Sequence, residues 1–493
     1  IESGDGLNFA ALYSYQKPGG DFKTSINIAA SQVDGEDIDS GLDRTLVGTP
    51  TYASGPINNK RDFVSAILSF ESGDLVALLQ LQESNRGDHF GTNNLLPPDD
   101  RQTVISESVL SADVRQSFEL DEQLSGAWSL NLLNTETEQN ALFFGQAEFF
   151  DPFSSQDDVV ADSLLEERRI EAEVNLAWEV SAHRLFGALI LTDIEVRESE
   201  QFISLTPNRV PTPTLNEFPS PVGDSEERSS VSVVLQDEYR IDDRLTLTAG
   251  LRYDNYEDID SNVSPRIALV WRRSDQHIFK TQLARAFKPP SLIEEGGSLE
   301  TDIDSETNDT LEFGHIFLDN DLVLRNTIYF SKLDNLILFQ DMAPFGYFNS
   351  GSFDLRGYEL EVEKSVGTDW DINASLSLQD YVDDKLPGAA PWMLKLGVEY
   401  ALMPLTGVHL QVNSLGSRDR EATDTRGDFE QTTQVDVSLR MQNFNNIDGL
   451  NFRAGIVNLL DDELKHPAPL DTYPDDYPYS DGATLWAQFT YQP

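Results

Sequence analysis

The sequence lacks cysteine altogether, which excludes a disulfide framework and any thiolate metal site. It also lacks any apolar run near the ~18 residues that a membrane-spanning helix needs, so a helical membrane protein is excluded. A glycine-rich phosphate loop, an HExxH motif and a GxSxG motif are missing as well. Carboxylates are so abundant that pairing any two as acid and base would be arbitrary. We therefore do not expect an enzyme.

Positive charge is scarce, because 35 lysines and arginines stand against 85 aspartates and glutamates, for a net charge of −50. A surface that binds phosphate backbones needs lysine and arginine, so we do not expect a nucleic-acid partner. The acidic excess has two interpretations. It can reflect solvated acidic loops or solubility in high salt, or it can hold divalent cations in loops or at the lipopolysaccharide surface.

Apolar residues recur with a period of two, which predicts β-strands. In the segment 245–254, Leu247 and Leu251 fall on one face, while Arg252 and Asp254 fall on the other. A soluble sandwich also alternates. A membrane barrel is favoured because the segments often reach ten or more residues and because the polar face is charged enough for a wet lumen. Aromatic residues also stand near segment ends, as in interface girdles: Tyr253, Trp271, Tyr400 and Tyr491.

The connections between alternating segments are short and long in turn. Short turns are expected at 71–74, 241–244, 318–321 and 366–369, and long polar loops at 85–102, 199–228, 288–308 and 465–482. This asymmetry is typical of bacterial barrels with short periplasmic turns and long extracellular loops. We expect an all-β fold, a transmembrane antiparallel β-barrel of about 22 strands in the bacterial outer membrane.

Four segments resemble TonB-dependent outer-membrane receptors, in the order that this family has them. They read QDEYRIDDRLTLTAGLRYDNYEDIDSNVSPRIALVW (236–271), TQLARAFKPPSLIE (281–294), YFNSGSFDLRGYELEVE (347–363) and VNLLDDE (457–463). We expect Gly250 and Gly357 on the lumen side to leave room for backbone or plug. The family's plug and TonB-binding segment have no counterpart that we can find, and GLNFAALYSYQ already alternates at 6–16. We expect residues 1–493 to form a single barrel domain without them.

The resemblance implies active uptake of a scarce ligand, such as a ferric siderophore, vitamin or saccharide. TonB would supply energy through a plug, and the barrel wall would contact outer-membrane lipid and lipopolysaccharide. The first alternative is a passive, plugless diffusion pore whose acidic lumen favours cations. The second is a soluble halophilic β-rich enzyme. No substrate follows from the sequence, and no cofactor is required by it.

An acidic segment, DGEDIDSGLD, is the candidate metal site. Hard oxygen ligands at near-alternate spacing suit calcium, although the spacing is not that of an EF-hand and a solvated loop is the simpler interpretation. The candidate ligands are Asp34, Glu36, Asp37, Asp39 and Asp43.

A second segment, DTYPDDYPYSDG, is the candidate ligand-binding loop. Tyrosine combines a rigid contact area with a polar tip, so Tyr473, Tyr477 and Tyr479 could touch a ligand. A plain external loop is the alternative.

Overall fold

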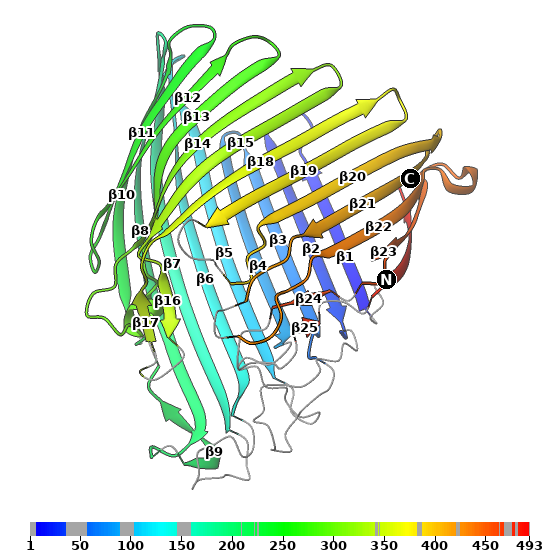
Figure 1. Ribbon diagram of the computed structural model, residues 1–493. Coiled ribbons are helices and arrows are strands. Elements are labelled where there is room, and N and C mark those ends of the chain that lie inside the picture. The colour runs from blue at the N-terminus through cyan, green and yellow to red at the C-terminus, as the bar shows by residue number, and fades with distance from the viewer. Residues whose placement is uncertain are drawn as a thin grey trace.

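The computed structural model is nearly all strand, and the strands form one curved antiparallel wall (Figure 1). It describes residues 6–35, 57–88, 103–144, 159–208, 210–220, 222–223, 226–340, 344, 346–381, 387–420, 424–462, 464–467, 476–478 and 482–492. None of the helices in this part of the chain is long and apolar enough to cross a bilayer.

The first half of the wall contains the longest strands, and its members are β1 (Gly6–Gln16), β2 (Phe22–Val33), β3 (Arg61–Ser72), β4 (Leu75–Gly87), β5 (Val104–Glu119), β6 (Leu124–Phe144), β7 (Val159–Val180), β8 (His183–Leu205), β9 (Pro211–Phe218), β10 (Glu227–Arg240) and β11 (Leu245–Tyr256). The second half comprises β12 (Asn262–Arg272), β13 (His277–Lys288), β14 (Glu306–Asp319), β15 (Leu322–Asp334), β18 (Phe353–Val366), β19 (Trp370–Tyr381), β20 (Trp392–Met403), β21 (Thr406–Leu415), β22 (Thr432–Met441), β23 (Leu450–Val457) and β26 (Thr484–Tyr491). Smaller elements lie in the connections: α1 (Leu292–Gly296), β16 (Ile337–Gln340), β17 (Gly346–Asn349), η1 (Phe444–Asn446), β24 (Lys465–His466) and β25 (Tyr477–Pro478).

Chain neighbours pair throughout this sheet of 22 strands, which confirms the predicted strand number. Three steps skip over smaller elements, because β8 pairs with β10, β15 with β18 and β23 with β26. Of the 22 strands, β9 pairs only with the far end of β8, so the other 21 follow one another round the wall. Every pairing is antiparallel, and β1 and β26 therefore run in the same direction. Antiparallel closure between these two edges needs a strand that runs the opposite way.

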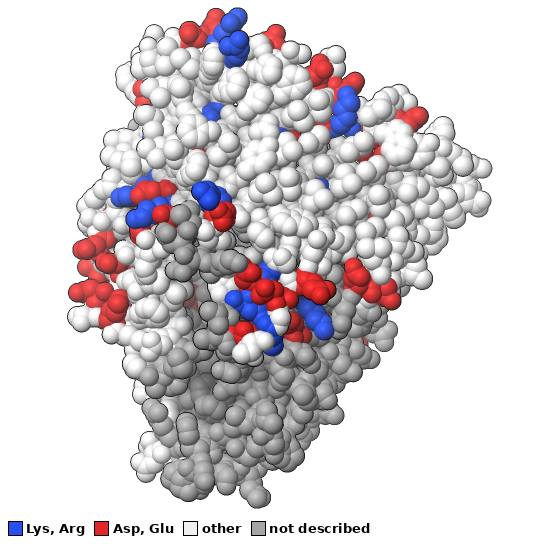
Figure 2. Space-filling view, in the orientation of Figure 1, with Lys and Arg blue, Asp and Glu red and all other residues white. Residues whose placement is uncertain are grey.

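The strand register confirms the predicted alternation, in which one face of the wall is apolar and the other is polar. The apolar set of the segment 245–254 pairs with the apolar set of β12, so that Leu247 lies opposite Leu269 and Leu251 opposite Pro265. The outer surface of the wall is accordingly almost free of charge, with blue and red clusters confined to its margins (Figure 2). Exposed large apolar side chains on this face suit lipid rather than water.

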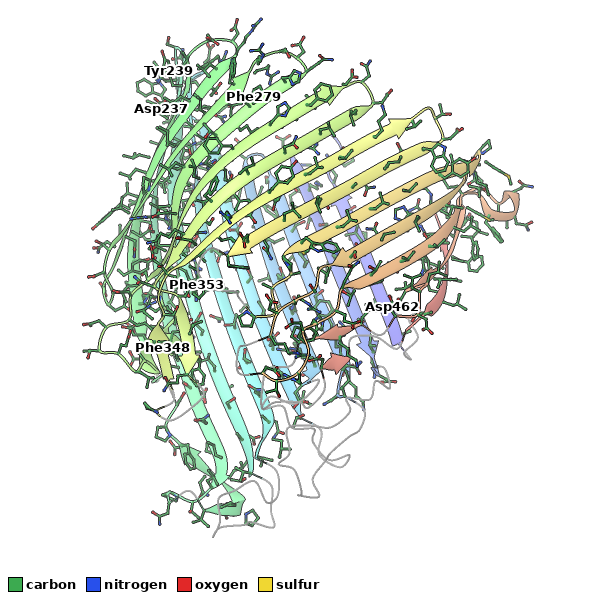
Figure 3. All side chains as sticks on the ribbon, in the orientation of Figure 1. Asp237, Tyr239, Phe279, Phe348, Phe353 and Asp462 are labelled. Carbon is green, nitrogen blue, oxygen red and sulfur yellow. The ribbon has the colours of Figure 1, made fainter. Side chains whose placement is uncertain are left out.

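Aromatic side chains gather on the outer face at the short-turn end of the strands, as predicted for an interface girdle. Trp370 and Tyr400 lie 4.3 Å apart between ring centroids, and Trp271 lies 5.6 Å from Phe279. Figure 3 shows Phe279 and Tyr239 near this end of the wall. Aromatic rings with one apolar and one polar edge favour the boundary between lipid and water. The short turns at this end mark it as the periplasmic one.

The four predicted short turns are confirmed, and two of them require glycine. Gly73 has φ +58° and Gly367 has φ +63°, in the left-handed region that glycine adopts without strain. One predicted loop is wrong in part: within 199–228, β8 continues to Leu205 and β9 pairs back onto it. The prolines that favoured a loop are tolerated because Pro211 begins a short edge strand. Val159, Ala161, Ile203 and Leu205 form a buried cluster beneath this hairpin.

Gly357 lies on the lumen face of β18, opposite Tyr329 of β15. The predicted space above this glycine is filled by the Tyr329 ring, because an added Cβ would lie 2.2 Å from the tyrosine Cζ. At Gly250 an added Cβ would meet the Leu235 carbonyl oxygen at an ordinary 3.5 Å. The two lumen-facing glycines therefore differ, and only Gly357 is required by a packed neighbour.

We expect Gly357→Ala to destabilise the barrel by about 1–3 kcal/mol, because the Tyr329 ring must leave its position. The matched control is Gly250→Ala, which makes only ordinary contacts. The measurement is the temperature at which the folded form in detergent converts to the unfolded form on a denaturing gel. Equal shifts for the two variants would contradict the packing role of Gly357.

Candidate functional site

Two long connections meet at the end of the wall opposite the aromatic girdle, where the short hairpin of β24 and β25 also lies (Figure 1). One connection joins β21 to β22, and the other joins β23 to β26. The first folds back on itself through an isolated antiparallel bridge between Arg418 and Phe429. We call this connection, residues 416–431, the arginine loop, since Arg418, Arg420 and Arg426 occur in it within nine residues.

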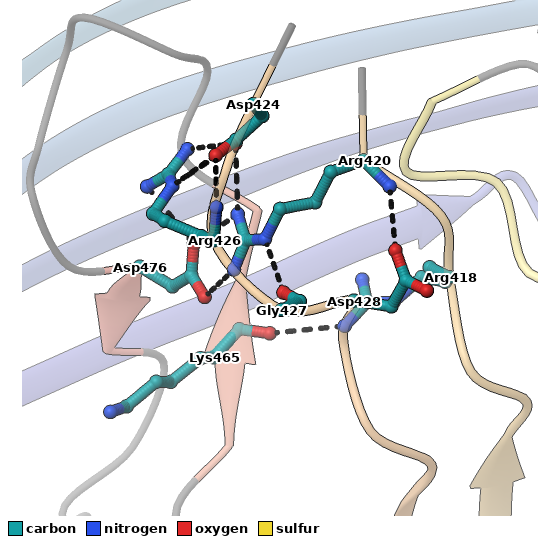
Figure 4. A network of polar contacts seen from close by, with 8 residues as sticks. All are labelled: Arg418, Arg420, Asp424, Arg426, Gly427, Asp428, Lys465 and Asp476. Atoms are coloured by element: carbon teal, nitrogen blue, oxygen red, sulfur yellow. Dashed lines mark hydrogen bonds and ion pairs between the residues drawn. The ribbon is translucent and has the colours of Figure 1, made fainter. Parts of the chain in front are cut away.

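Arg420 joins the two connections (Figure 4). Its guanidinium donates to both oxygens of Asp476, at 3.0 Å and 2.5 Å, and its Nε donates to the Gly427 carbonyl oxygen at 2.7 Å. The Arg420 and Asp476 side chains are only 9% and 13% exposed, so solvent screens this ion pair little. A bidentate arginine–carboxylate pair of this kind fixes orientation as well as charge.

Phe429 lies beneath two of these arginines. The Cζ of Arg420 lies 3.8 Å from the ring centroid, and the Cζ of Arg418 lies 4.8 Å from it. Planar guanidinium groups stack favourably on an aromatic face, and partial burial strengthens the attraction. The loop thus has a small core built from one ring and two cations, in place of the aliphatic core that so polar a segment cannot form.

Asp424 lies within the arginine loop and forms an ion pair with Arg426. Hydrogen bonds from the Nε and Nη2 of Arg426 and from the Arg426 backbone amide lower the pKa of Asp424 to about 2. Burial lowers the pKa of Arg418, which donates to the Lys465 carbonyl oxygen and makes no ion pair within the described part of the chain. Burial, aided by Arg418, also lowers the pKa of His466. This histidine is therefore neutral at pH 7.

A second polar junction joins β10 to the β11–β12 connection and to the β13–β14 connection. Arg228 of β10 is 5% exposed and pairs with Asp258 and Glu295, each at 2.6 Å. It also donates to the Pro290 carbonyl oxygen. Ser291 caps α1 in a reciprocal box with Glu294, so the short helix is held at both its start and its side. Burial raises the pKa of Glu295.

The lumen face of the wall is polar along its length. Arg325 lies opposite Glu361 and close to Glu363, and Arg440 pairs with Glu399 at 2.6 Å. Asp254, fully buried, accepts from Arg252 at 2.7 Å. Side chains of this kind offer hydrogen bonds to a hydrated or polar ligand, and those named show no nucleophile–base arrangement. This face is therefore suited to contact with water or with a polar molecule.

The calcium prediction is mostly outside the described residues. Asp34 is exposed just beyond the end of β2, whereas Glu36, Asp37, Asp39 and Asp43 lie in segments that the structure does not describe. Among the described residues, no three or more His, Asp or Glu side chains group so as to hold a metal ion. Calcium binding in this loop therefore stays a prediction.

The prediction that three tyrosines contact a ligand is also untested by the described residues. Tyr473 and Tyr479 lie outside the described residues, and Tyr477 is described only through its backbone, which pairs with His466 in the β24–β25 hairpin. Its neighbour Asp476 is the residue that the structure places in contact with the arginine loop. Sequence reasoning missed that loop. The signal that could have found it was the density of arginine in a chain with so little positive charge.

We expect Asp424→Asn to loosen the arginine loop, because Arg426 loses its charged acceptor. The native ion pair should be complete above the unfolded carboxyl pKa of ~3.9 and be lost only as the pH falls through about 2. At pH 3 pepsin should therefore cut residues 416–431 in the variant well before the native protein. Glu399→Gln, in an exposed lumen pair, is the control and should leave cleavage unchanged. Equal cleavage of native protein and Asp424→Asn would contradict this role.

Comparison with known proteins agrees with this architecture. The family model of the TonB-dependent receptor-like β-barrel matches residues 32–459. The siderophore receptor PirA from Acinetobacter baumannii is 15% identical, with a TM-score of 0.72 over 99% of this chain and 78% of that one. The ferric-catecholate import receptor Fiu from Escherichia coli K12 is 14% identical, with a TM-score of 0.71 over 100% of this chain and 80% of that one.

The FrpB iron transporter from Neisseria meningitidis is 13% identical, with a TM-score of 0.72 over 100% of this chain and 80% of that one. No curated protein matches the sequence. At these identities the solved structures establish the fold, while the family model covers most of the chain. The chain belongs to the TonB-dependent receptor β-barrel family of bacterial outer-membrane proteins.

Proposed function

We propose that this protein takes up a ferric siderophore across the outer membrane, with energy supplied by TonB. The observation that carries the proposal is the arginine loop, locked to the neighbouring connection at the extracellular mouth of a polar lumen. The structural relatives named as siderophore or iron receptors support the same ligand class.

The charge distribution supports an anionic ligand. A chain of net charge −50 repels anions over most of its surface, so capture of one needs local positive charge. At the mouth, Arg418 would supply it, because it lies over the ring of Phe429 and makes no ion pair within the described part of the chain, whereas Arg420 is already paired with Asp476. Arginine forks bind carboxylate and phenolate oxygens through paired hydrogen bonds, and aromatic faces stack on planar ligand groups.

The route below the mouth supports transport rather than storage. The lumen wall offers alternating acidic and basic groups, such as Arg325 beside Glu361, that can exchange hydrogen bonds with a passing ligand. Energy coupling requires a plug segment, and none lies among the described residues. The experiment must therefore use the natural precursor as the cell makes it.

We expect cells expressing the natural precursor to accumulate radioactive iron from at least one of three chelates, a catecholate, a hydroxamate or a carboxylate. Accumulation should stop when TonB is inactive, because active transport needs its energy. Uptake that continues without TonB would support the passive pore instead. If none of the three chelates is taken up while the protein is displayed at the surface, the siderophore assignment is wrong.

A variant tests the mouth directly. Arg420→Gln should weaken binding of the transported chelate by about tenfold, since the fork and the stacking on Phe429 are both lost. Arg440→Gln, in an exposed lumen pair, serves as the charge-matched control. Binding is measured on intact cells at equal surface display. Equal loss in both variants would remove the arginine loop from ligand capture.

A further inference from the structure

Two cations mark the ends of a level row on the lumen face of the wall, near its periplasmic end. Arg240, the last residue of β10, lies opposite Thr246 of β11. Thr246 lies opposite Val270 of β12, which in turn lies opposite Lys280 of β13. Residues directly opposite each other share a face of the sheet, and Thr246 is on the face of the lumen residue Gly250. Arg240 and Lys280 therefore belong to the lumen.

Two more arginines lie opposite each other one step nearer the turns. Arg272 ends β12, and its amide donates to the carbonyl oxygen of Arg244, immediately before β11, at 2.7 Å. Both lie two residues from the Thr246–Val270 pair, so they continue its lumen face. The turns that follow β10 and β12 lie side by side at the upper edge of the wall in Figure 1. We call this set of four the exit cluster: Arg240, Arg244, Arg272 and Lys280.

The exit cluster is exposed, and its four cations make no ion pair within the described part of the chain. Asp242 accepts from the backbone amide of Arg244 at 2.7 Å and so fixes the turn, while Asp243 and Asp275 lie in the turns without pairing to the cluster. Like charges directly opposite each other destabilise a sheet, and opposite residues in a hydrogen-bonded pair have Cα atoms about 5.5 Å apart. A bound anion would relieve this repulsion between Arg244 and Arg272.

The charge of the lumen face reverses along the same level row. Beyond Lys280 the row passes through Gly314 of β14 and Thr327 of β15 to Glu359 of β18. Two more carboxylates follow on the lumen face of β18 toward its turn: Glu361 and Glu363. An anion in this part of the lumen is repelled from the β18 side and attracted to the side of β10 to β13.

The next arginine along the chain shows that the exit cluster is specific to the lumen face. Arg273 follows Arg272, and its Cζ lies 5.8 Å from the centroid of the Trp271 ring, which belongs to the outer aromatic girdle. This cation therefore has an aromatic partner on the other face of the wall. The unpaired cations of this region are those that line the periplasmic exit of the lumen.

We propose that the exit cluster binds a small anion with several carboxylate groups as it passes from the lumen to the periplasm. Arginine forks bind carboxylates through paired hydrogen bonds, and four cations on two rows suit a ligand with more than one negative group. In a chain of net charge −50, such a ligand is held only where the local charge is positive. The anion site depends on the exit cluster alone, whereas its part in transport rests on the proposed uptake of an anionic chelate.

Isothermal titration calorimetry of the full chain in an uncharged detergent, at low ionic strength, tests the anion site. Citrate is the probe, because it is small and carries three carboxylates, and triethyl citrate is its uncharged counterpart. We expect citrate to bind, triethyl citrate not to bind, and added salt to weaken the binding of citrate. No binding of citrate, or equal binding of the ester, would overturn the proposal.

A triple variant locates the bound citrate, and replaces three cations of the exit cluster by glutamine: Arg240→Gln, Arg244→Gln and Arg272→Gln. It should weaken citrate binding by about tenfold. The control changes the net charge equally at three arginines that already hold a carboxylate: Arg325→Gln, Arg356→Gln and Arg440→Gln. Lysine at the three cluster positions keeps the charge and should retain most of the binding, which distinguishes loss of contact from loss of folding. An equal loss in the triple variant and its control would refute the site.

Two further measurements separate the exit cluster from the mouth. Arg418→Gln should leave citrate binding unchanged, and loss of binding in this variant would place the citrate at the mouth and overturn the proposal. In cells that make the natural precursor, the triple variant should lower the maximal rate of chelate uptake and leave chelate binding at the surface unchanged. If no chelate is taken up, the proposed function fails, while calorimetry still decides whether the exit cluster binds an anion.

Discussion

Main-chain hydrogen bonding in lipid is the constraint on which the rest of this structure depends. A bilayer offers no water to an unpaired amide or carbonyl group, so a membrane-spanning sheet must satisfy every such group through its neighbouring strands. The wall meets this requirement by pairing each strand from β2 to β23, apart from the short β9, with two antiparallel neighbours. Among the described residues, β1 and β26 are the two ends of this continuous run, and they carry the most exposed apolar side chains of the wall. Leu7 is 73% exposed and Leu485 is 77% exposed. Both edges run in the same direction, so they cannot pair with each other in the antiparallel way that the rest of the wall uses.

The same constraint explains why so much of the wall could be predicted from sequence. A strand between lipid and a wet lumen must alternate, and its face is then readable from single residues such as Leu251 and Arg252. Short turns such as Gly73-Asp74 fix the register of each hairpin, so strand order follows from chain order. The prediction was wrong where a strand leaves the membrane. Beyond the bilayer no lipid enforces alternation, and the prolines near Pro211 suggested a loop in a segment that pairs as an edge strand.

The candidate site could not be predicted for a different reason. Arg420 and Asp476 are 56 residues apart, and their contact depends on how two long connections fold over the mouth. No periodicity relates them, since each loop is shaped by polar contacts between particular side chains. The tyrosine-rich segment was chosen for its composition, yet the side chain in it that the structure connects to the arginine loop is an aspartate. Composition can mark a loop as unusual, but only the structure shows which side chains of two loops contact each other.

Positive charge is scarce in this chain, so a place where several arginines lie close together is informative about function. In a chain of net charge −50, the acidic residues already keep the surface soluble, so cations are not needed for solubility. Cations occur along the whole wall, but the arginine loop holds three of them within nine residues. There Asp476 and Asp424 keep the guanidinium groups of Arg420 and Arg426 oriented. A barrel wall alone would serve any outer-membrane pore, so under the proposed function the selectivity for a ligand must reside in the connections that fold over the mouth.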